Sequence, residues 1–294
     1  MCHRQAVRSG ANIMANNFAY EVTGLGSDLF GIIDLNTGVF TPIGSMGQTL
    51  AGIGNYNGVI YGGAYHGNTL YSVNTSTGAL TAIGTGNISY AAFGSTTSDL
   101  YAFGDNGDLY SINPTNGAAT DIGPTGLSFS GIVMGMSSGS STLYLTQNNS
   151  LYSLNTKNGH ATLIGTTNEG ESGFGALVSI GGTLYGGAYD ASTPDLYTLN
   201  PRTGGTTFVA ASPSTPSAPG VAGFWGLAPV TNGITNGHHH DEASSGLEAN
   251  NSVALFNQFV AAGFPEQQGG PITTNAVSQI TNNEQQFLVN PHHG

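Results

Sequence analysis

The side chains best suited to chemistry in this sequence are aromatic rings that stand beside hydrogen-bonding or acidic groups. Tyr65-His66 and Tyr189-Asp190 are two such pairs, and Trp225 follows a proline-rich stretch over 212–223. An aromatic ring beside an acceptor suits a sugar, because the ring stacks on C–H groups while the acceptor binds hydroxyls. The sequence therefore predicts a ligand-binding site made of Tyr65, His66, Asp105, Glu171, Tyr189, Asp190 and Trp225. The simpler alternative is that these are loop residues hydrogen-bonded to nearby backbone.

A catalytic interpretation needs two carboxylates about 5–10 Å apart across a glycosidic bond. Glu171 and Asp190 could supply this pair, but nothing in the sequence fixes their separation. The chain has no His-Glu-x-x-His helix and no phosphate-binding loop. His238-His239-His240 is interpreted as a solvated linker patch rather than a metal site. We therefore assign no catalytic residue, metal or cofactor, and a glycoside-cleaving enzyme stays an alternative.

The elements that must hold these residues are repeated strands. Leu70–Gly84 (LYSVNTSTGALTAIG) contains two alternating runs joined by a turn with a glycine, which indicates a β-hairpin. Two further strand-like runs precede the hairpin in each repeat, and a period of about 40 residues built only from strands is typical of a β-propeller. Similar hairpins are predicted at Phe30–Gly44, Leu109–Gly123, Leu151–Gly165 and, more loosely, Leu196–Ala210.

The ends of the repeat array predict how the ring closes. The chain enters at the second strand of a blade, Phe18–Val22, and leaves at a first strand, Phe224–Val230. Pairing these two strands removes the exposed edges of an open array. We therefore expect an all-β fold, a five-bladed β-propeller of four-stranded blades over 17–230. The innermost strands, each with Gly or Ala at its third residue, are predicted at Leu50–Ile53, Tyr90–Phe93, Phe129–Ile132, Phe174–Leu177 and Phe224–Leu227.

Repeats of the type LYSINPxTGAATxIG, best seen at Leu109–Gly123, resemble those of a large group of bacterial propeller-repeat proteins. The resemblance covers 17–230 and implies a propeller that, as in most of the group, acts outside the cell. Its motif is structural, so it implies no site residue. Five-bladed propellers include a sugar-binding lectin and several glycoside hydrolases, which is an analogy of fold alone.

Charge narrows the possible partners. The chain has 4 Lys and Arg residues and a formal net charge of −12, which disfavours nucleic acid and anionic membrane surfaces as partners. No apolar run is long enough to span a membrane. Lys157 and Arg202 fall in the uniform turns between the third and fourth strands, opposite the candidate site. The site face therefore has no Lys or Arg to hold phosphate or carboxylate, which favours neutral ligands or cations.

The two ends of the chain lie outside the repeats. Residues 1–16 are predicted to be a disordered extension, with Met14 as an alternative start to Met1. Residues 231–246 are predicted to be a flexible linker containing His238–His240, and 247–294 a weakly helical or disordered tail. The tail is either a passive appendage or an uncleaved C-terminal export signal. The second interpretation would explain how a propeller without an apolar leader is exported.

The function that follows is a non-catalytic, extracellular ligand-binding or interaction propeller, with neutral glycan as the leading ligand class. The alternatives are the glycoside-cleaving enzyme and a protein-interaction scaffold without a small ligand. We expect a monomer that is secreted or held at the cell surface and binds a glycan or a cell-surface protein. A cytoplasmic protein is the alternative location.

Overall fold

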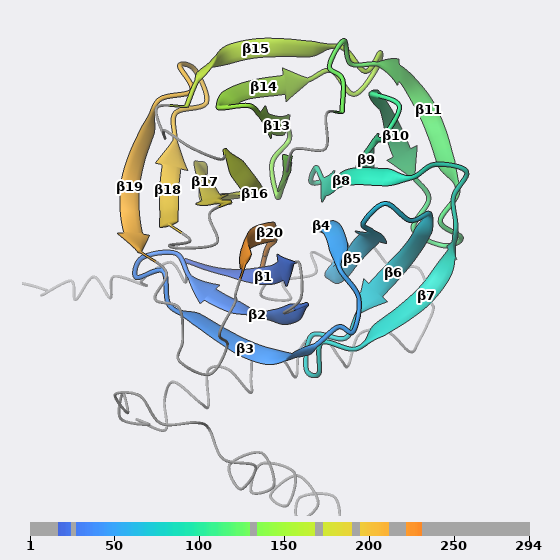
Figure 1. The fold of residues 1–294 in the computed structure, drawn as a ribbon, viewed down its shortest axis with the longest axis horizontal. Coiled ribbons are helices and arrows are strands. Elements are labelled where there is room, and N and C mark those ends of the chain that lie inside the picture. The colour runs from blue at the N-terminus through green and yellow to red at the C-terminus, as the bar shows by residue number, and fades with distance from the viewer. Residues whose placement is uncertain are drawn as a thin grey trace, which may run out of the picture.

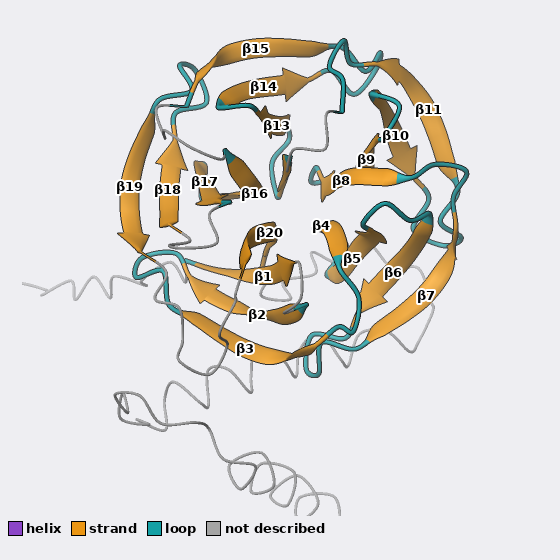
Figure 2. Ribbon diagram, in the orientation of Figure 1, coloured by secondary structure: helices purple, strands orange, loops and turns teal. Residues whose placement is uncertain are grey.

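The computed structural model describes residues 17–24, 28–129, 134–167, 173–189, 195–211 and 222–230. Every regular element in these ranges is a β-strand, and the strands form a ring of sheets around a central axis (Figure 1). Within each sheet the chain runs back and forth from an innermost strand near the axis to an outermost strand on the wall (Figure 2). This arrangement is a β-propeller. No helix in the described part of the chain is long and apolar enough to cross a membrane.

Three of the sheets have four strands each. The first contains β20 (Ala222–Pro229), β1 (Phe18–Gly24), β2 (Leu29–Asp34) and β3 (Phe40–Ser45). The second contains β4 (Leu50–Tyr56), β5 (Val59–Ala64), β6 (Thr69–Val73) and β7 (Leu80–Thr85). The third contains β8 (Tyr90–Ser95), β9 (Leu100–Gly104), β10 (Asp108–Ile112) and β11 (Ala119–Pro124).

The fourth sheet has eight strands. Its first half is β12 (Gly135–Ser138), β13 (Leu143–Gln147), β14 (Ser150–Leu154) and β15 (Ala161–Thr166). Its second half is β16 (Phe174–Ile180), β17 (Thr183–Ala188), β18 (Asp195–Leu199) and β19 (Thr206–Ala211). The innermost strands β12 and β16 join the halves through two parallel pairs, Ser137 with Leu177 and Ser138 with Val178. All other neighbours in this sheet are antiparallel.

The ring closes where the sequence predicts. β20, from the C-terminal end of the array, pairs antiparallel with β1, and Tyr20 faces Ala228 while Glu21 faces Leu227. One sheet therefore takes its innermost strand from one end of the array and its other three from the other end. This pairing covers the inner edge of β1 and gives β20 a neighbour in the same sheet.

One predicted strand differs from the structure. The innermost strand of this repeat is β12 at Gly135–Ser138, where Gly135 pairs with Thr146 and Met136 with Leu145, whereas the sequence predicts it at Phe129–Ile132. Phe129 is not part of a strand, and 130–132 lie outside the described residues. The prediction failed because Phe-Ser-Gly-Ile matches the repeat pattern better than Gly-Met-Ser-Ser, and pairing with β13 decides the register.

The repeated turn between the third and fourth strands has a simple local cause. The Asn74 side-chain oxygen accepts a hydrogen bond from the backbone N–H of Ser76 at 2.9 Å, and Gly78 takes a φ of +76°. An Asx turn followed by a left-handed residue favours Asn or Asp at its first position and Gly at the left-handed position. The same bond is made by Asp34, Asn113, Asn155 and Asn200.

The Ile-Gly ending of each repeat joins neighbouring sheets. In β7, Ile83 is the extra residue of a β-bulge, because Tyr71 pairs with Ala82 and Leu70 with Gly84. Gly84 then lies so close to the next sheet's turn that an added Cβ would overlap the carbonyl oxygen of Asn116. Gly44, Gly123 and Gly165 meet the following turn in the same way. At the ring closure, Ala210 takes the place of the glycine and its Cβ would lie 3.1 Å from a Cβ on Gly38.

We predict that Gly84→Ala destabilises the protein although its φ suits alanine, because the methyl group would collide with backbone. The expected loss is about 1–3 kcal/mol in the free energy of unfolding, the usual range for overpacking. Gly205→Ala is the matched control, since its nearest contact would be an ordinary 3.4 Å from Thr203 Oγ1. Thermal unfolding of both variants measures the difference. Equal melting temperatures would show that these glycines do not hold the sheets together.

The closing sheet also buries an acid. Glu21 on β1 is 3% exposed, and its Oε2 has no hydrogen-bond partner among the described residues. It lies on the same face of β1 as Ala19, which packs in an apolar cluster with Val178 and Phe224. Burial raises the pKa of this carboxyl well above its usual value of 4.5. The folded protein therefore keeps Glu21 protonated at a pH where the unfolded chain has already lost the proton.

A stability profile from pH 4 to pH 8 tests this. Because the folded-state pKa is raised, stability is fully present below pH 4.5 and is lost as pH rises toward the folded pKa. We expect Glu21→Gln to gain on the parent as pH rises, by at most about tenfold in the folding equilibrium constant per pH unit. Asp121→Asn, an exposed acid on β11, is the control. A constant offset between Glu21→Gln and the parent across this range would contradict the assignment.

Candidate functional site

The candidate site lies at one end of the propeller, the upper face, which carries the connections from second to third strands and from outermost to innermost strands. The residue that follows a second strand there donates its backbone N–H to the residue that precedes the innermost strand. These bonds are Tyr65 to Thr49 at 3.1 Å, Asp105 to Ser89 at 3.1 Å and Tyr189 to Gly173 at 2.9 Å. The same scaffold thus places Tyr65, Asp105 and Tyr189 at corresponding positions in three repeats.

Trp225 holds two of the tyrosines together. Its ring centroid is 4.7 Å from that of Tyr65 and 5.8 Å from that of Tyr189, both edge-on. Trp225 is the extra residue of a β-bulge, since Phe224 pairs with Thr23 and Gly226 with Val22. The corresponding bulge residues in β8 and β16 are the small Ala91 and Gly175. A β-bulge changes the direction of the side chain at the extra residue. In the last strand of the array this residue is Trp225, which is much larger than Ala91 and Gly175.

Trp225 is a support rather than a contact surface. It is only 3% exposed, and an added Cβ on Gly24 would overlap its ring. The predicted residue is therefore in the cluster, but it offers little surface to a ligand. Tyr65 is partly buried, and Tyr189 is one of the partly buried residues packed against the same core as Trp225. The surface available for stacking belongs to these two tyrosines.

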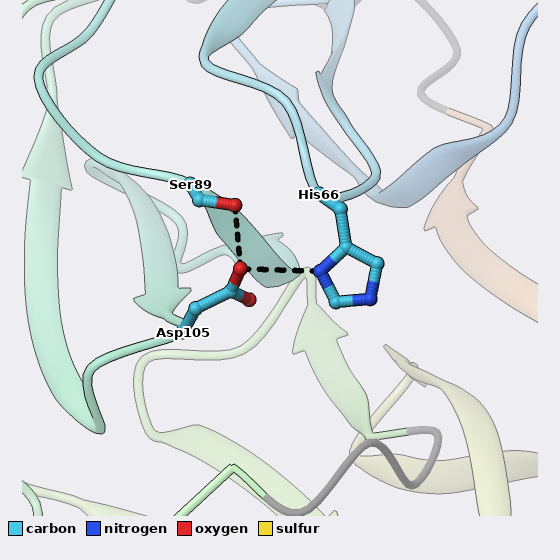
Figure 3. Close-up of polar contacts among 3 residues, drawn as sticks. All are labelled: His66, Ser89 and Asp105. Carbon is cyan, nitrogen blue, oxygen red and sulfur yellow. Dashed lines mark hydrogen bonds and ion pairs between the residues drawn. The ribbon is translucent and has the colours of Figure 1, made fainter.

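A polar array of His66, Asp105 and Ser89, shown in Figure 3, adjoins the aromatic cluster through Tyr65. His66 Nδ1 lies 3.1 Å from Asp105 Oδ2, and the Ser89 hydroxyl donates to the same oxygen at 2.6 Å. The imidazole lies against Tyr65, with centroids 4.0 Å apart, and against Phe129 at 5.3 Å. Side-chain exposure is 44% for His66 and 35% for Asp105, so solvent reaches both.

The geometry assigns a role to each nitrogen of His66. In the tautomer that donates its Nδ1–H to the Asp105 carboxylate, Nε2 keeps a free lone pair. Figure 3 shows Nε2 pointing away from Asp105. The backbone of His66 takes a φ of +52°, and its N–H donates to the Tyr90 carbonyl at 3.0 Å. A non-glycine residue in this conformation is uncommon and is held here by the neighbouring strand.

The Tyr65 hydroxyl stays protonated. Burial raises its pKa first, and the neighbouring Tyr189 and Asp105 raise it further. It therefore serves as a hydrogen-bond donor or acceptor rather than as an anion. Across the described residues of this face there is no Lys or Arg, because Lys157 and Arg202 both lie in turns at the opposite end.

Five of the seven predicted residues are thus described, and they form one connected group: Tyr65, His66, Asp105, Tyr189 and Trp225. Glu171 and Asp190 lie outside the described residues, and so does His238–His240. Elsewhere, among the residues with assigned positions, no three His, Cys, Asp or Glu side chains gather closely enough to hold a metal ion.

Sequence reasoning missed Ser89 and Phe129. Ser89 precedes the innermost strand β8, at the position that the repeat brings beside Asp105. No sequence pattern marks this position, because the hydrogen bond between the Asp105 N–H and the Ser89 carbonyl follows from the fold. The sequence predicts Phe129 inside a strand, whereas it lies before β12 and its ring contacts His66.

Comparison with known proteins adds resemblance at the level of shape. No family model and no curated protein matches the chain. A Bacteroides thetaiotaomicron protein of unknown function matches at 19% identity and a TM-score of 0.42, over 55% of this chain and 43% of its own. A chain of a nidogen/laminin complex matches at 9% sequence identity and a TM-score of 0.49, and the match covers 72% of this chain and 97% of that chain. Myxococcus xanthus glutaminyl cyclase matches at 16% sequence identity and a TM-score of 0.42, and the match covers 55% of this chain and 69% of that chain. The chain thus spans less than half of the Bacteroides protein, and no ligand or activity is transferred from these three.

Proposed function

We propose that this chain is a five-bladed, non-catalytic binding propeller whose upper face takes a neutral glycan. The observation that carries the proposal is the junction of the Tyr65–Tyr189–Trp225 cluster with the His66–Asp105–Ser89 array. These residues come from separate repeats and meet only in the folded ring.

The blade count rests on the strand order. Three sheets are one blade each, and the eight-stranded sheet is interpreted as two blades whose innermost strands β12 and β16 pair in parallel. The repeated contact between a strand-end residue and the next sheet's turn supports this division. The contact is made by Gly44, Gly84, Gly123 and Gly165, each with the turn that follows in the chain. Ala210 makes the last such contact, with the first turn at Gly38.

The chemistry of the site favours a sugar among neutral ligands. The two tyrosine rings supply apolar surface for C–H groups, and Trp225 fixes their orientation. His66 Nε2 accepts a hydrogen bond from a hydroxyl, while Asp105 and the Tyr65 hydroxyl add an acceptor and a donor. A phosphorylated or carboxylated ligand would find no cation among the described residues of this face.

A glycan ligand also suits an extracellular protein. We propose that the chain is secreted or held at the cell surface, as in most of the propeller-repeat group that its hairpins resemble. A glycan-bearing cell-surface protein would present the same chemistry as a free oligosaccharide.

A neutral-glycan array followed by titration calorimetry on any ligand found tests the proposal. We expect Tyr65→Ala and His66→Ala each to weaken binding by about tenfold, equivalent to one stacking or hydrogen-bonding contact. His160→Ala, an exposed histidine beside the turn between β14 and β15, and Lys157→Ala are the controls and should bind normally. Tyr65→Phe separates the ring from the hydroxyl and should retain most of the affinity.

The outcomes distinguish the alternatives. Release of reducing sugar from a bound glycan, abolished by Asp190→Asn or Glu171→Gln, would replace the proposal by the glycoside-cleaving enzyme. No binding to any glycan would leave the protein-interaction scaffold. Equal losses in the His66 and His160 variants would place the ligand somewhere else.

A further inference from the structure

One outward position differs sharply among the outermost strands. This position lies on the outermost strand, directly before the extra residue of its β-bulge, and pairs with a residue of the third strand. In chain order it is occupied by Pro42, Ala82, Asp121, Leu163 and Phe208. Proline and a charged side chain are common means of protecting a strand edge from association. Leu163 and Phe208, by contrast, are 57% and 55% exposed, the highest fractions among the large apolar side chains of the described residues.

The same part of the wall carries the Lys and Arg residues of the described ranges. Lys157 lies in the turn that leads into β15 and Arg202 in the turn that leads into β19. Both are exposed, and within the described ranges neither forms an ion pair. An added Cβ on Gly165 would overlap the carbonyl oxygen of Thr203, so the end of β15 reaches the turn that holds Arg202. We call the surface formed by Lys157, Leu163, Arg202 and Phe208 the β15–β19 rim.

A matching segment exists in the chain itself. Residues 231–294 contain no Lys or Arg, and their acids are Asp241, Glu242, Glu248, Glu266 and Glu284. The same segment holds two apolar groups, Phe256–Val260 and Phe287–Val289. Its charge and apolar content are thus complementary to those of the rim.

The attachment point allows contact. β20 ends at Pro229, whose carbonyl accepts a hydrogen bond from the Asn55 side chain at 3.0 Å. Asn55 lies next to the hairpin between β4 and β5, at the end of the propeller opposite the candidate site. The turns with Lys157 and Arg202 are at that same end. A random-coil chain of this length would span on the order of 40 Å, enough to cross a small domain.

We propose that the C-terminal segment 231–294 docks on the β15–β19 rim of its own chain. Its apolar groups cover Leu163 and Phe208, and its carboxylates pair with Lys157 and Arg202. Tethering makes the encounter intramolecular and raises its effective concentration to the millimolar range. The inference is independent of the glycan site, which lies on the other face.

Hydrogen–deuterium exchange of the full chain, read by mass spectrometry, tests the docking. We expect peptides around 256–260 and 287–289 to exchange about tenfold faster in Leu163→Asn/Phe208→Asn than in the parent, the effect of losing about 1.4 kcal/mol of docking energy. Lys157→Glu/Arg202→Glu should have a similar effect, and the charge-preserving Lys157→Arg/Arg202→Lys should not. Val39→Asn, at a valine that is 46% exposed in the turn between β2 and β3, is the control.

Two results would overturn the proposal. The first is tail exchange that is the same in the parent and in both rim variants. The second is protection that depends on protein concentration and accompanies dimers in light scattering, because the rim would then be covered by a second copy. Melting curves confirm that each rim variant remains folded, so that loss of protection is assigned to docking.

Discussion

The pairing of β1 with β20 is the constraint on which the rest of the structure depends. Each sheet of the propeller packs against its neighbours, so a gap anywhere would expose two apolar faces to water. The chain avoids this by completing one sheet from both ends of the array, with Ala19 opposite Pro229 and Val22 opposite Gly226. The contact between Ala210 and Gly38 repeats the same closure on the outer wall.

Most of the fold could be predicted from the repeat pattern. The hairpin turn, its Asx residue and its glycine are local requirements, so sequence spacing alone located them at Asn74 and Gly78. Ring closure followed from strand order. The register of β12 did not follow, because Gly135–Ser138 is selected by pairing with β13 and β16 rather than by its own pattern. Long-range pairing overrode the local resemblance of Phe129–Ile132 to the other innermost strands.

The candidate site was predictable in part for the same reason. Tyr65, Asp105 and Tyr189 occupy corresponding positions, so their shared location was implied by the repeat. The role of Trp225 was not, because a sequence does not state which residue of a strand becomes the bulge. Its burial changes its role from platform to support. Ser89 reaches Asp105 only through the fold of the connection between β7 and β8.

The position of Trp225 in the last strand has a consequence for synthesis. A ribosome delivers Tyr65, His66 and Asp105 long before β20, and domains tend to fold as their chain emerges. A chain that ends before β20 lacks the indole ring that contacts both Tyr65 and Tyr189. Only the final strand both seals the ring and completes the aromatic cluster. The candidate site is thereby coupled to the completeness of the array, and a chain released too early would have neither a closed ring nor the full aromatic cluster.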